Sequence, residues 1–73
     1  MNAEFYSLPT DVQAAIRRVV NRARSEGGRR SEELPNGADV YAYPGRNGTN
    51  WGHNRASDGF CDARGTWPAG EQA

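Results

Sequence analysis

His53 and Cys61 are the only histidine and the only cysteine of the sequence, and they lie eight residues apart. A cysteine and a histidine can act as a nucleophile and its general base, and Asp58 or Asp62 could orient the imidazole ring. Any short chain with one residue of each type meets this description, and no flanking motif indicates a strained nucleophile turn. We therefore interpret Cys61 as a small buried hydrophobic residue beside Phe60, and His53 as a loop residue that hydrogen-bonds to a neighbouring backbone group.

The other groupings that could carry chemistry are equally weak. A zinc site would need His53, Cys61 and two carboxylates, whereas structural zinc is normally held by four Cys or His ligands at characteristic spacings. The glycine-rich segment 45–52 has neither the spacing of a dinucleotide-binding loop nor the ending of a P-loop. Glu32 and Glu33 are adjacent, so in a regular element they point in different directions. We therefore expect a protein that is not an enzyme and that binds no metal or cofactor.

Tyr41, Tyr43 and Trp51 lie close together in the sequence, and a turn that contains Arg46 joins them. Tyr, Trp and Arg are enriched among the residues that dominate binding energy at interfaces, and aromatic rings also stack on unpaired bases. The alternative is that Trp51 and Trp67 replace missing leucines and cover the apolar side of a helix. We favour this core role for the tryptophans and expect Tyr41 and Tyr43 to be partly exposed.

Residues 8–26 carry the spacing of an amphipathic helix, which is the clearest element of the sequence. Pro9 suits its first position, and Thr10 and Gln13 have the spacing of a capping box. The glycine pair at 27–28 supplies candidate left-handed caps at its end. The apolar stripe of this helix consists of Val12, Ile16, Val19, Val20 and Ala23.

The remainder of the chain is rich in glycine and proline and reads as strands joined by turns. We expect a polar connector over residues 27–37 and a strand over the alternating segment 38–43. The Asn47–Gly48 dipeptide favours a tight hairpin with a return strand near 49–52. A further short strand is expected around 59–63, where it would pack against the helix and complete a small sheet.

These elements predict an α+β fold in a single small domain of residues 1–73, with one N-terminal amphipathic helix packed on a small irregular antiparallel sheet. The glycine-rich strand and loop region covers residues 38–67, and residues 68–73 form a frayed tail. The alternative is a helix with a largely loop-like remainder. Val, Ile, Leu and Phe make up only nine of the 73 residues, so the core is small and formation of a homo-oligomer is an available source of stability.

The formal net charge is zero, but the charges are unevenly distributed. Residues 11–30 contain six arginines and two acids, a local net charge of +4, whereas residues 31–73 contain three arginines and six acids, a local net charge of −3. An arginine-rich helix can bind phosphates, but these arginines lie on both flanks of the apolar stripe and form no single row. We favour a solvated face whose arginines cover the edges of the core.

The sequence offers no membrane anchor. No apolar run approaches the roughly 20 residues needed to span a bilayer, and the N-terminus lacks the charged and apolar regions of a secretory signal. We therefore expect a soluble protein of the cytoplasm. The use of arginine without lysine, with many alanines and glycines, favours a GC-rich bacterial or phage genome, and hence a bacterial cell or a phage-infected host.

We predict a non-enzymatic small binding protein, a bacterial or phage inhibitor or accessory factor that occupies a surface of a protein or nucleoprotein target. Inhibition by occupancy needs only a rigid patch and a few anchoring residues. The alternative is a nucleic-acid-binding protein that lays its arginine-rich helix against phosphates. The residues expected to contact the partner are Arg17, Arg18, Arg22, Arg24, Tyr41, Tyr43, Arg46 and Trp51.

Overall fold

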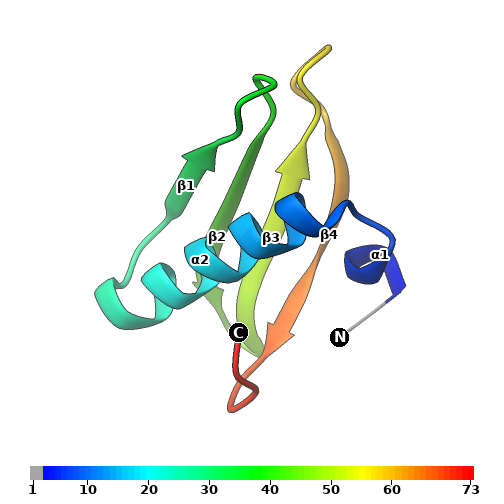
Figure 1. The fold of residues 1–73 in the computed structure, drawn as a ribbon. Coiled ribbons are helices and arrows are strands. Elements are labelled where there is room, and N and C mark those ends of the chain that lie inside the picture. The colour runs from blue at the N-terminus through cyan, green and yellow to red at the C-terminus, as the bar shows by residue number, and fades with distance from the viewer. Residues whose placement is uncertain (1–2) are drawn as a thin grey trace.

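The computed structural model describes residues 3–73 and consists of two layers, a helical layer and a four-stranded antiparallel sheet (Figure 1). The strands follow one another across the sheet in chain order, β1-β2-β3-β4. The predicted α+β fold is confirmed, although a short helix precedes the long one. The elements are α1 (Ala3–Tyr6), α2 (Thr10–Glu26), β1 (Arg30–Glu33), β2 (Asp39–Gly45), β3 (Gly48–Asn54) and β4 (Cys61–Pro68).

Helix α2 begins at Thr10, two residues later than expected, and ends at Glu26 as expected. The capping box does not form, because no side chain caps the first turn; the Gln13 amide instead donates to the carbonyl of Leu8 at 2.8 Å. At the other end Gly27 has a φ of 76°, and its N–H closes the last turn on the carbonyl of Ala23, which confirms the glycine cap. No helix within residues 3–73 is long and apolar enough to cross a membrane.

One face of the sheet is covered by α2, and two tryptophans dominate the space between the layers. Trp51 and Trp67 are the largest buried side chains, each 1 % exposed. Phe5 of α1 meets both in edge-to-face contacts, with ring centroids 5.7 Å from Trp51 and 5.1 Å from Trp67. The predicted core role of the tryptophans is confirmed, since they supply the apolar area that leucines would otherwise supply. The buried residues of α2 are Val12, Ala15, Ile16, Val19, Val20 and Ala23.

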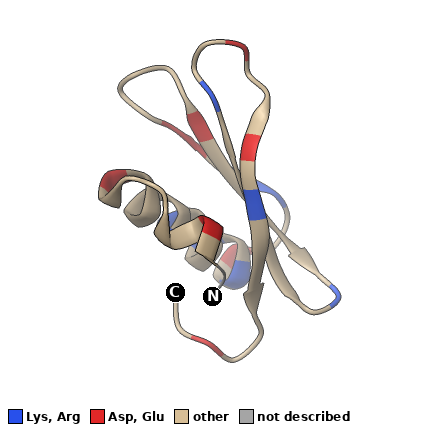
Figure 2. Ribbon diagram, turned by 90° about the vertical axis from the view of Figure 1, so that its right-hand side faces the viewer, with Lys and Arg blue, Asp and Glu red and all other residues tan. Residues whose placement is uncertain are grey.

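The other face of the sheet is open. Strand alternation places Tyr41, Gly52 and Arg64, which are neighbours across β2, β3 and β4, on the side away from α2. Figure 2 shows the helices on one side of the sheet only, so no element of residues 3–73 covers this second side. The sheet therefore presents a surface of its own to the solvent.

Two segments differ from the sequence-based expectation. The connector expected over 27–37 contains β1, which pairs with β2. Its four residues are all polar, so they show no alternation of apolar and polar side chains that would predict a strand. The last strand runs over Cys61–Pro68 and not around 59–63, because a turn occupies the residues before Cys61. In both cases pairing with the neighbouring strand decides the conformation, and the local sequence pattern of the segment does not reveal it.

The C-terminal segment 68–73 was expected to fray, but it packs against the C-terminal half of α2. The Arg24 guanidinium donates to the carbonyl of Pro68 at 2.7 Å, and the Trp67 indole donates to the carbonyl of Gln72 at 3.2 Å. The Asn21 amide donates to the carbonyl of Ala73 at 3.0 Å. These bonds use side chains to satisfy backbone acceptors outside the regular elements.

Ile16→Val removes one methylene from a side chain that is 0 % exposed. We expect the free energy of unfolding to fall by about 1 kcal/mol, because burial is lost and a small cavity is left. Urea denaturation followed by tryptophan fluorescence measures the change, since both tryptophans lie in the core. Arg22→Gln, on the solvent side of the same helix, is the control and should change stability by less than about 0.5 kcal/mol. Equal losses in the two variants would contradict the packing described for α2.

Candidate interaction surface on the open face of the sheet

The two residues considered for nucleophilic chemistry lie on opposite faces of the sheet. Cys61 is the cross-strand partner of Asn54, and its thiol lies beside the Tyr41 hydroxyl on the open face. His53 pairs with the buried Ala63, and a register irregularity separates the two pairs. His53 belongs to β3 and not to a loop, and Cys61 is exposed and not buried, so both sequence-based interpretations are corrected. The thiol and the imidazole are therefore not arranged as a nucleophile and its base.

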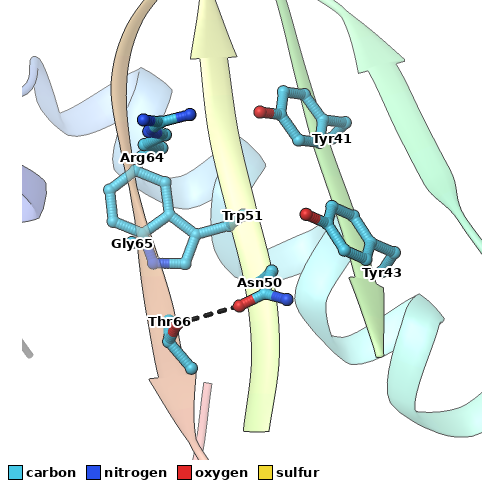
Figure 3. Close-up of a pocket in the computed structure, with 7 residues that line it drawn as sticks. All are labelled: Tyr41, Tyr43, Asn50, Trp51, Arg64, Gly65 and Thr66. Carbon is cyan, nitrogen blue, oxygen red and sulfur yellow. Dashed lines mark hydrogen bonds between the residues drawn. The ribbon is translucent and has the colours of Figure 1, made fainter. Parts of the chain in front are cut away.

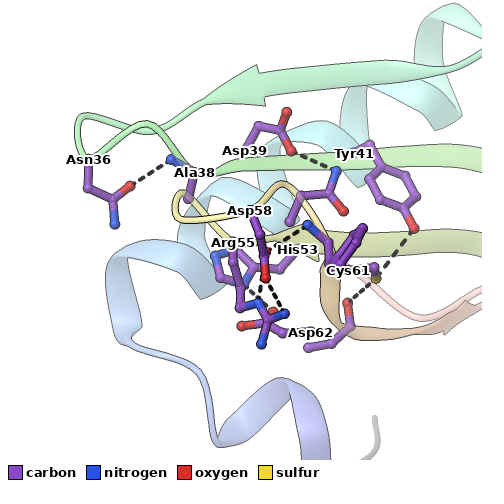
Figure 4. A network of polar contacts seen from close by, with 12 residues as sticks. Asn36, Ala38, Asp39, Tyr41, His53, Arg55, Asp58, Cys61 and Asp62 are labelled. Carbon is purple, nitrogen blue, oxygen red and sulfur yellow. Dashed lines mark hydrogen bonds and ion pairs between the residues drawn. The ribbon is translucent and has the colours of Figure 1, made fainter.

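Each of these groups has a different partner (Figure 4). The His53 Nδ1 atom lies 2.6 Å from a carboxylate oxygen of Asp62. The Cys61 thiol donates to the carbonyl of Ala63 at 3.2 Å and lies 3.7 Å from the Tyr41 hydroxyl. Within the described part of the chain, no group of three or more His, Cys, Asp or Glu residues is placed to hold a metal ion.

Asp58, the second candidate to orient the imidazole, serves the turn between β3 and β4 instead. It accepts a hydrogen bond from the backbone N–H of Phe60 at 3.0 Å and forms a two-pronged contact with the Arg55 guanidinium. The Phe60 N–H and the Arg55 guanidinium hold the pKa of the Asp58 carboxyl below its ordinary value. The contacts of Asp58 with Phe60 and Arg55 therefore stabilise this turn and keep the Asp58 carboxyl ionised.

The open face is built around two tyrosines of β2. The rings of Tyr41 and Tyr43 are parallel within 8°, with centroids 6.2 Å apart, and both lean across β3 with their hydroxyls toward β4 (Figure 3). Tyr43 is 40 % exposed. Tyr41 is half-buried because it lies on Gly52, where a Cβ atom would come within 2.2 Å of the ring. Gly52 therefore makes the position of the Tyr41 ring possible.

A shallow hollow of about 340 Å³ lies beside the tyrosines, between β2 and β4. The Asn50 side-chain oxygen accepts a hydrogen bond from the Thr66 hydroxyl at 2.8 Å, and its amide nitrogen has no partner among the described residues. Arg64 closes the hollow at its other end. The walls therefore offer aromatic rings, one cation and neutral hydrogen-bonding groups, and no carboxylate.

Three arginines around this face have no carboxylate partner in residues 3–73. They are Arg64 on β4, Arg46 in the turn between β2 and β3, and Arg29 just before β1. The Arg29 guanidinium lies over the Tyr41 ring, 4.2 Å from its centroid, which is a cation–π contact. Their positive charge is thus not neutralised by a carboxylate of residues 3–73. The arginines that do form ion pairs are Arg18, Arg22, Arg30 and Arg55.

The acidic groups of the open face gather at the far end of the strands. Glu33 and Asp39 face each other across β1 and β2, in the same row as Asn54. Asp39 accepts a hydrogen bond from the Asn54 amide at 2.8 Å. The face is therefore acidic at this end and basic toward the turn between β2 and β3, with the tyrosines between the two.

The helix arginines lie in the other layer, and internal contacts occupy them. Arg17 lies over the rings of Phe5 and Trp67, with 5.3 and 5.0 Å to the centroids. Arg18 forms a two-pronged hydrogen bond with Glu32, and these bonds hold the pKa of the Glu32 carboxyl below its ordinary value. These contacts tie the helix to the sheet and the core.

The remaining helix arginines contact the chain itself as well. Arg22 lies 3.9 Å from a carboxylate oxygen of Glu26, and Arg24 donates to the Thr49 hydroxyl and to the C-terminal segment. The eight residues expected to contact a partner are therefore not brought together. The structure separates the four helix arginines from Tyr41, Tyr43 and Arg46, and it buries Trp51 in the core.

The sequence-based list missed four residues of this surface. Arg64 and Thr66 alternate with Ala63 and Trp67 along β4, so an alternating pattern over 61–68 could have placed them on the open face. Gly52 and Asn50 carry no comparable signal, because their role depends on what lies across the strand. The missed residues are Asn50, Gly52, Arg64 and Thr66.

Comparison of the chain with protein-family models, with curated proteins and with solved structures found no match.

The pH dependence of the free energy of unfolding tests the placement of Tyr41 on this surface. Burial, followed by the contact with the Cys61 thiol, raises the pKa of the Tyr41 hydroxyl above its ordinary value of 10.0. The folded state holds this proton more firmly than the unfolded state, so the stabilisation is complete below about pH 10 and is lost as the pH rises through the raised pKa. We expect the alkaline decrease in the free energy of unfolding to be smaller in Tyr41→Phe than in the wild type.

Urea denaturation at a series of pH values between about 8 and 11 measures this difference. Tyr6→Phe is the control, because the Tyr6 side chain is 58 % exposed. An alkaline decrease that Tyr6→Phe reduces and Tyr41→Phe leaves unchanged would contradict the placement of the Tyr41 ring.

Proposed function

We propose that this protein is a non-enzymatic binding module that occupies a surface of a protein or nucleoprotein target, and that the open face of its sheet makes the contact. The observation that carries the proposal is the pair of parallel tyrosines on an uncovered sheet face, with arginines around it that lack carboxylate partners. Tyrosine and arginine are typical anchors of binding surfaces. An inhibitor or accessory factor that acts by occupancy needs no further chemistry.

The rigidity of this face supports the proposal. The tyrosines project from the middle of a four-stranded sheet, and Tyr41 is held by Gly52 beneath it and by the Arg29 guanidinium over its ring. Side chains that are already ordered lose less conformational entropy on binding, and tyrosine has few rotatable bonds to restrict. A small domain can therefore bind through a limited area.

The bacterial or phage setting is part of the same proposal. A small inhibitor or accessory factor of the cytoplasm has to select its target among many other proteins, so its specificity matters as much as its affinity. A face that is acidic at one end and basic at the other orients an approaching partner by its charge. The partner is then expected to carry the complementary arrangement.

The arginine-rich helix is a weaker candidate for contact with phosphates. To bind them, Arg18 would have to leave Glu32 and Arg24 would have to release the C-terminal segment. The carboxylates of Glu26 and Glu32 would also lie beside the phosphates and repel them. The open face needs no such rearrangement, because its arginines pair with no carboxylate of the described residues.

Affinity capture with matched variants tests the proposed surface. Immobilised wild type, Tyr43→Ala, Arg64→Gln and Arg22→Gln are exposed to a bacterial lysate over a salt series, with and without nuclease, and bound proteins are identified by mass spectrometry. We expect the wild type and Arg22→Gln to retain the same target, and Tyr43→Ala and Arg64→Gln to lose at least about tenfold of it. Circular dichroism verifies that all variants are folded.

The result that would reject the proposal is equally specific. A target that is lost with Arg22→Gln and retained by Tyr43→Ala would assign binding to the helix. The absence of any captured protein that depends on Tyr43 or Arg64 would leave the open face without a target.

A further inference from the structure

We infer that the open face binds single-stranded nucleic acid, with an unpaired base on the ring of Tyr43 and phosphates at Arg29, Arg46 and Arg64. The inference rests on the proposed function, since it uses the same face and names its partner. Single strands are typically bound by a positively charged groove lined with aromatic rings on which bases stack.

The geometry of the two rings suits an unpaired base. Their centroids are 6.2 Å apart and their planes are parallel within 8°, so the rings are offset along β2 and Tyr41 does not cover Tyr43. The Arg29 guanidinium lies over the Tyr41 ring at 4.2 Å and Gly52 lies beneath it, so the two faces of this ring are occupied and Arg29 is held on the open face. No described arginine lies over Tyr43, which is 40 % exposed. Tyr43 is therefore the ring that a base reaches.

The cations are placed for a backbone that crosses the sheet. Arg29 lies on the β1 side of the tyrosines and Arg64 lies on β4, so they lie on either side of the two rings. Arg46 adds a third charge in the turn where β2 and β3 meet. None of the three forms an ion pair within residues 3–73, so binding a phosphate breaks no internal pair. A phosphate backbone is the polyanion that this arrangement complements.

Neutral hydrogen-bonding groups lie where the edges of the bases would be. The Asn50 amide nitrogen has no partner in the described chain, and the Thr66 hydroxyl and the Asn50 oxygen already point toward each other. Both residues line the hollow beside Tyr43. Amides and hydroxyls can bond to the exposed edges of unpaired bases, which are available only when the bases are not in a duplex.

The acidic end of the face limits the length of strand that can bind. Glu33 and Asp39 lie beyond Tyr41 in the direction away from the basic turn, so a strand that left its path across the sheet and turned along β2 would meet like charges. The footprint is therefore short, and a rigid duplex, which also withholds its bases, is excluded. With three phosphate contacts, a plot of the logarithm of the association constant against the logarithm of the salt concentration should have a slope of about −2.

Fluorescence anisotropy with labelled oligonucleotides of about eight nucleotides tests the inference. The probes are oligo-dT, oligo-U and a hairpin duplex, with poly-glutamate as a competitor. We expect the wild type to bind a single strand with the salt slope given above, and to bind the duplex at least about tenfold more weakly. A preference for oligo-dT or oligo-U identifies DNA or RNA as the strand, and either one supports the inference.

Variants assign the binding to the proposed residues. Tyr43→Ala should weaken binding about tenfold through lost stacking, and Arg64→Gln should also make the salt slope shallower by about 0.7. Gly52→Ala removes no ring and no charge but forces the Tyr41 ring to move, and we expect a several-fold loss. Arg22→Gln, an arginine of the helix layer, is the matched control and should bind as the wild type does.

Three results would overturn the inference. These are no binding of either single strand, binding that Tyr43→Ala leaves intact, and displacement of the strand by poly-glutamate at matched charge, which would indicate an acidic protein partner. If no strand binds but Tyr43→Ala still loses a captured protein, the inference fails and the proposed function stands. If neither is observed, both fail.

Discussion

The packing of α2 against one side of the sheet is the contact on which the rest of the structure depends. The sequence contains few large apolar residues, so only one layer of core can be filled, and Trp51, Trp67 and Phe5 fill much of it with aromatic rings. Burial of apolar area is the main favourable term in folding, and a chain of this size has little in reserve. The second side of the sheet consequently stays open and is free to carry polar and aromatic groups.

The arginines divide according to the same two layers. On the helix side, Arg17 covers aromatic rings, Arg18 pairs with Glu32, and Arg24 holds the C-terminal segment. These contacts stabilise a marginal core by covering its edges and satisfying exposed carbonyls. Around the open face, Arg46 and Arg64 form no ion pair with the described chain. The net charge therefore does not distinguish the arginines that form internal contacts from the arginines around the open face that form no ion pair within residues 3–73.

The open face shows how a small residue shapes the surface of a sheet. Gly52 lies in the middle of β3, where a side chain would strengthen the strand, yet its missing Cβ gives the Tyr41 ring a place on the sheet. Burial of that ring raises the pKa of its hydroxyl. The Tyr41 ring is thus held within the fold by Gly52 beneath it and by Arg29 over it.

Local patterns determined much of this protein. The apolar stripe of residues 12–23, the glycine cap at Gly27 and the alternation around Tyr41 and Tyr43 predict the helix, its end and the partly exposed tyrosines, because each depends on neighbours a few residues away. Strand β1 and the register of β4 depend on pairing with an adjacent strand, and the docked C-terminus depends on contact with α2, so these features were decided only in the folded chain. The composition of the open face was also decided only in the folded chain. The helix arginines and the tyrosines lie in different layers, because tertiary packing assigns each side chain to the core, the helix side or the open face.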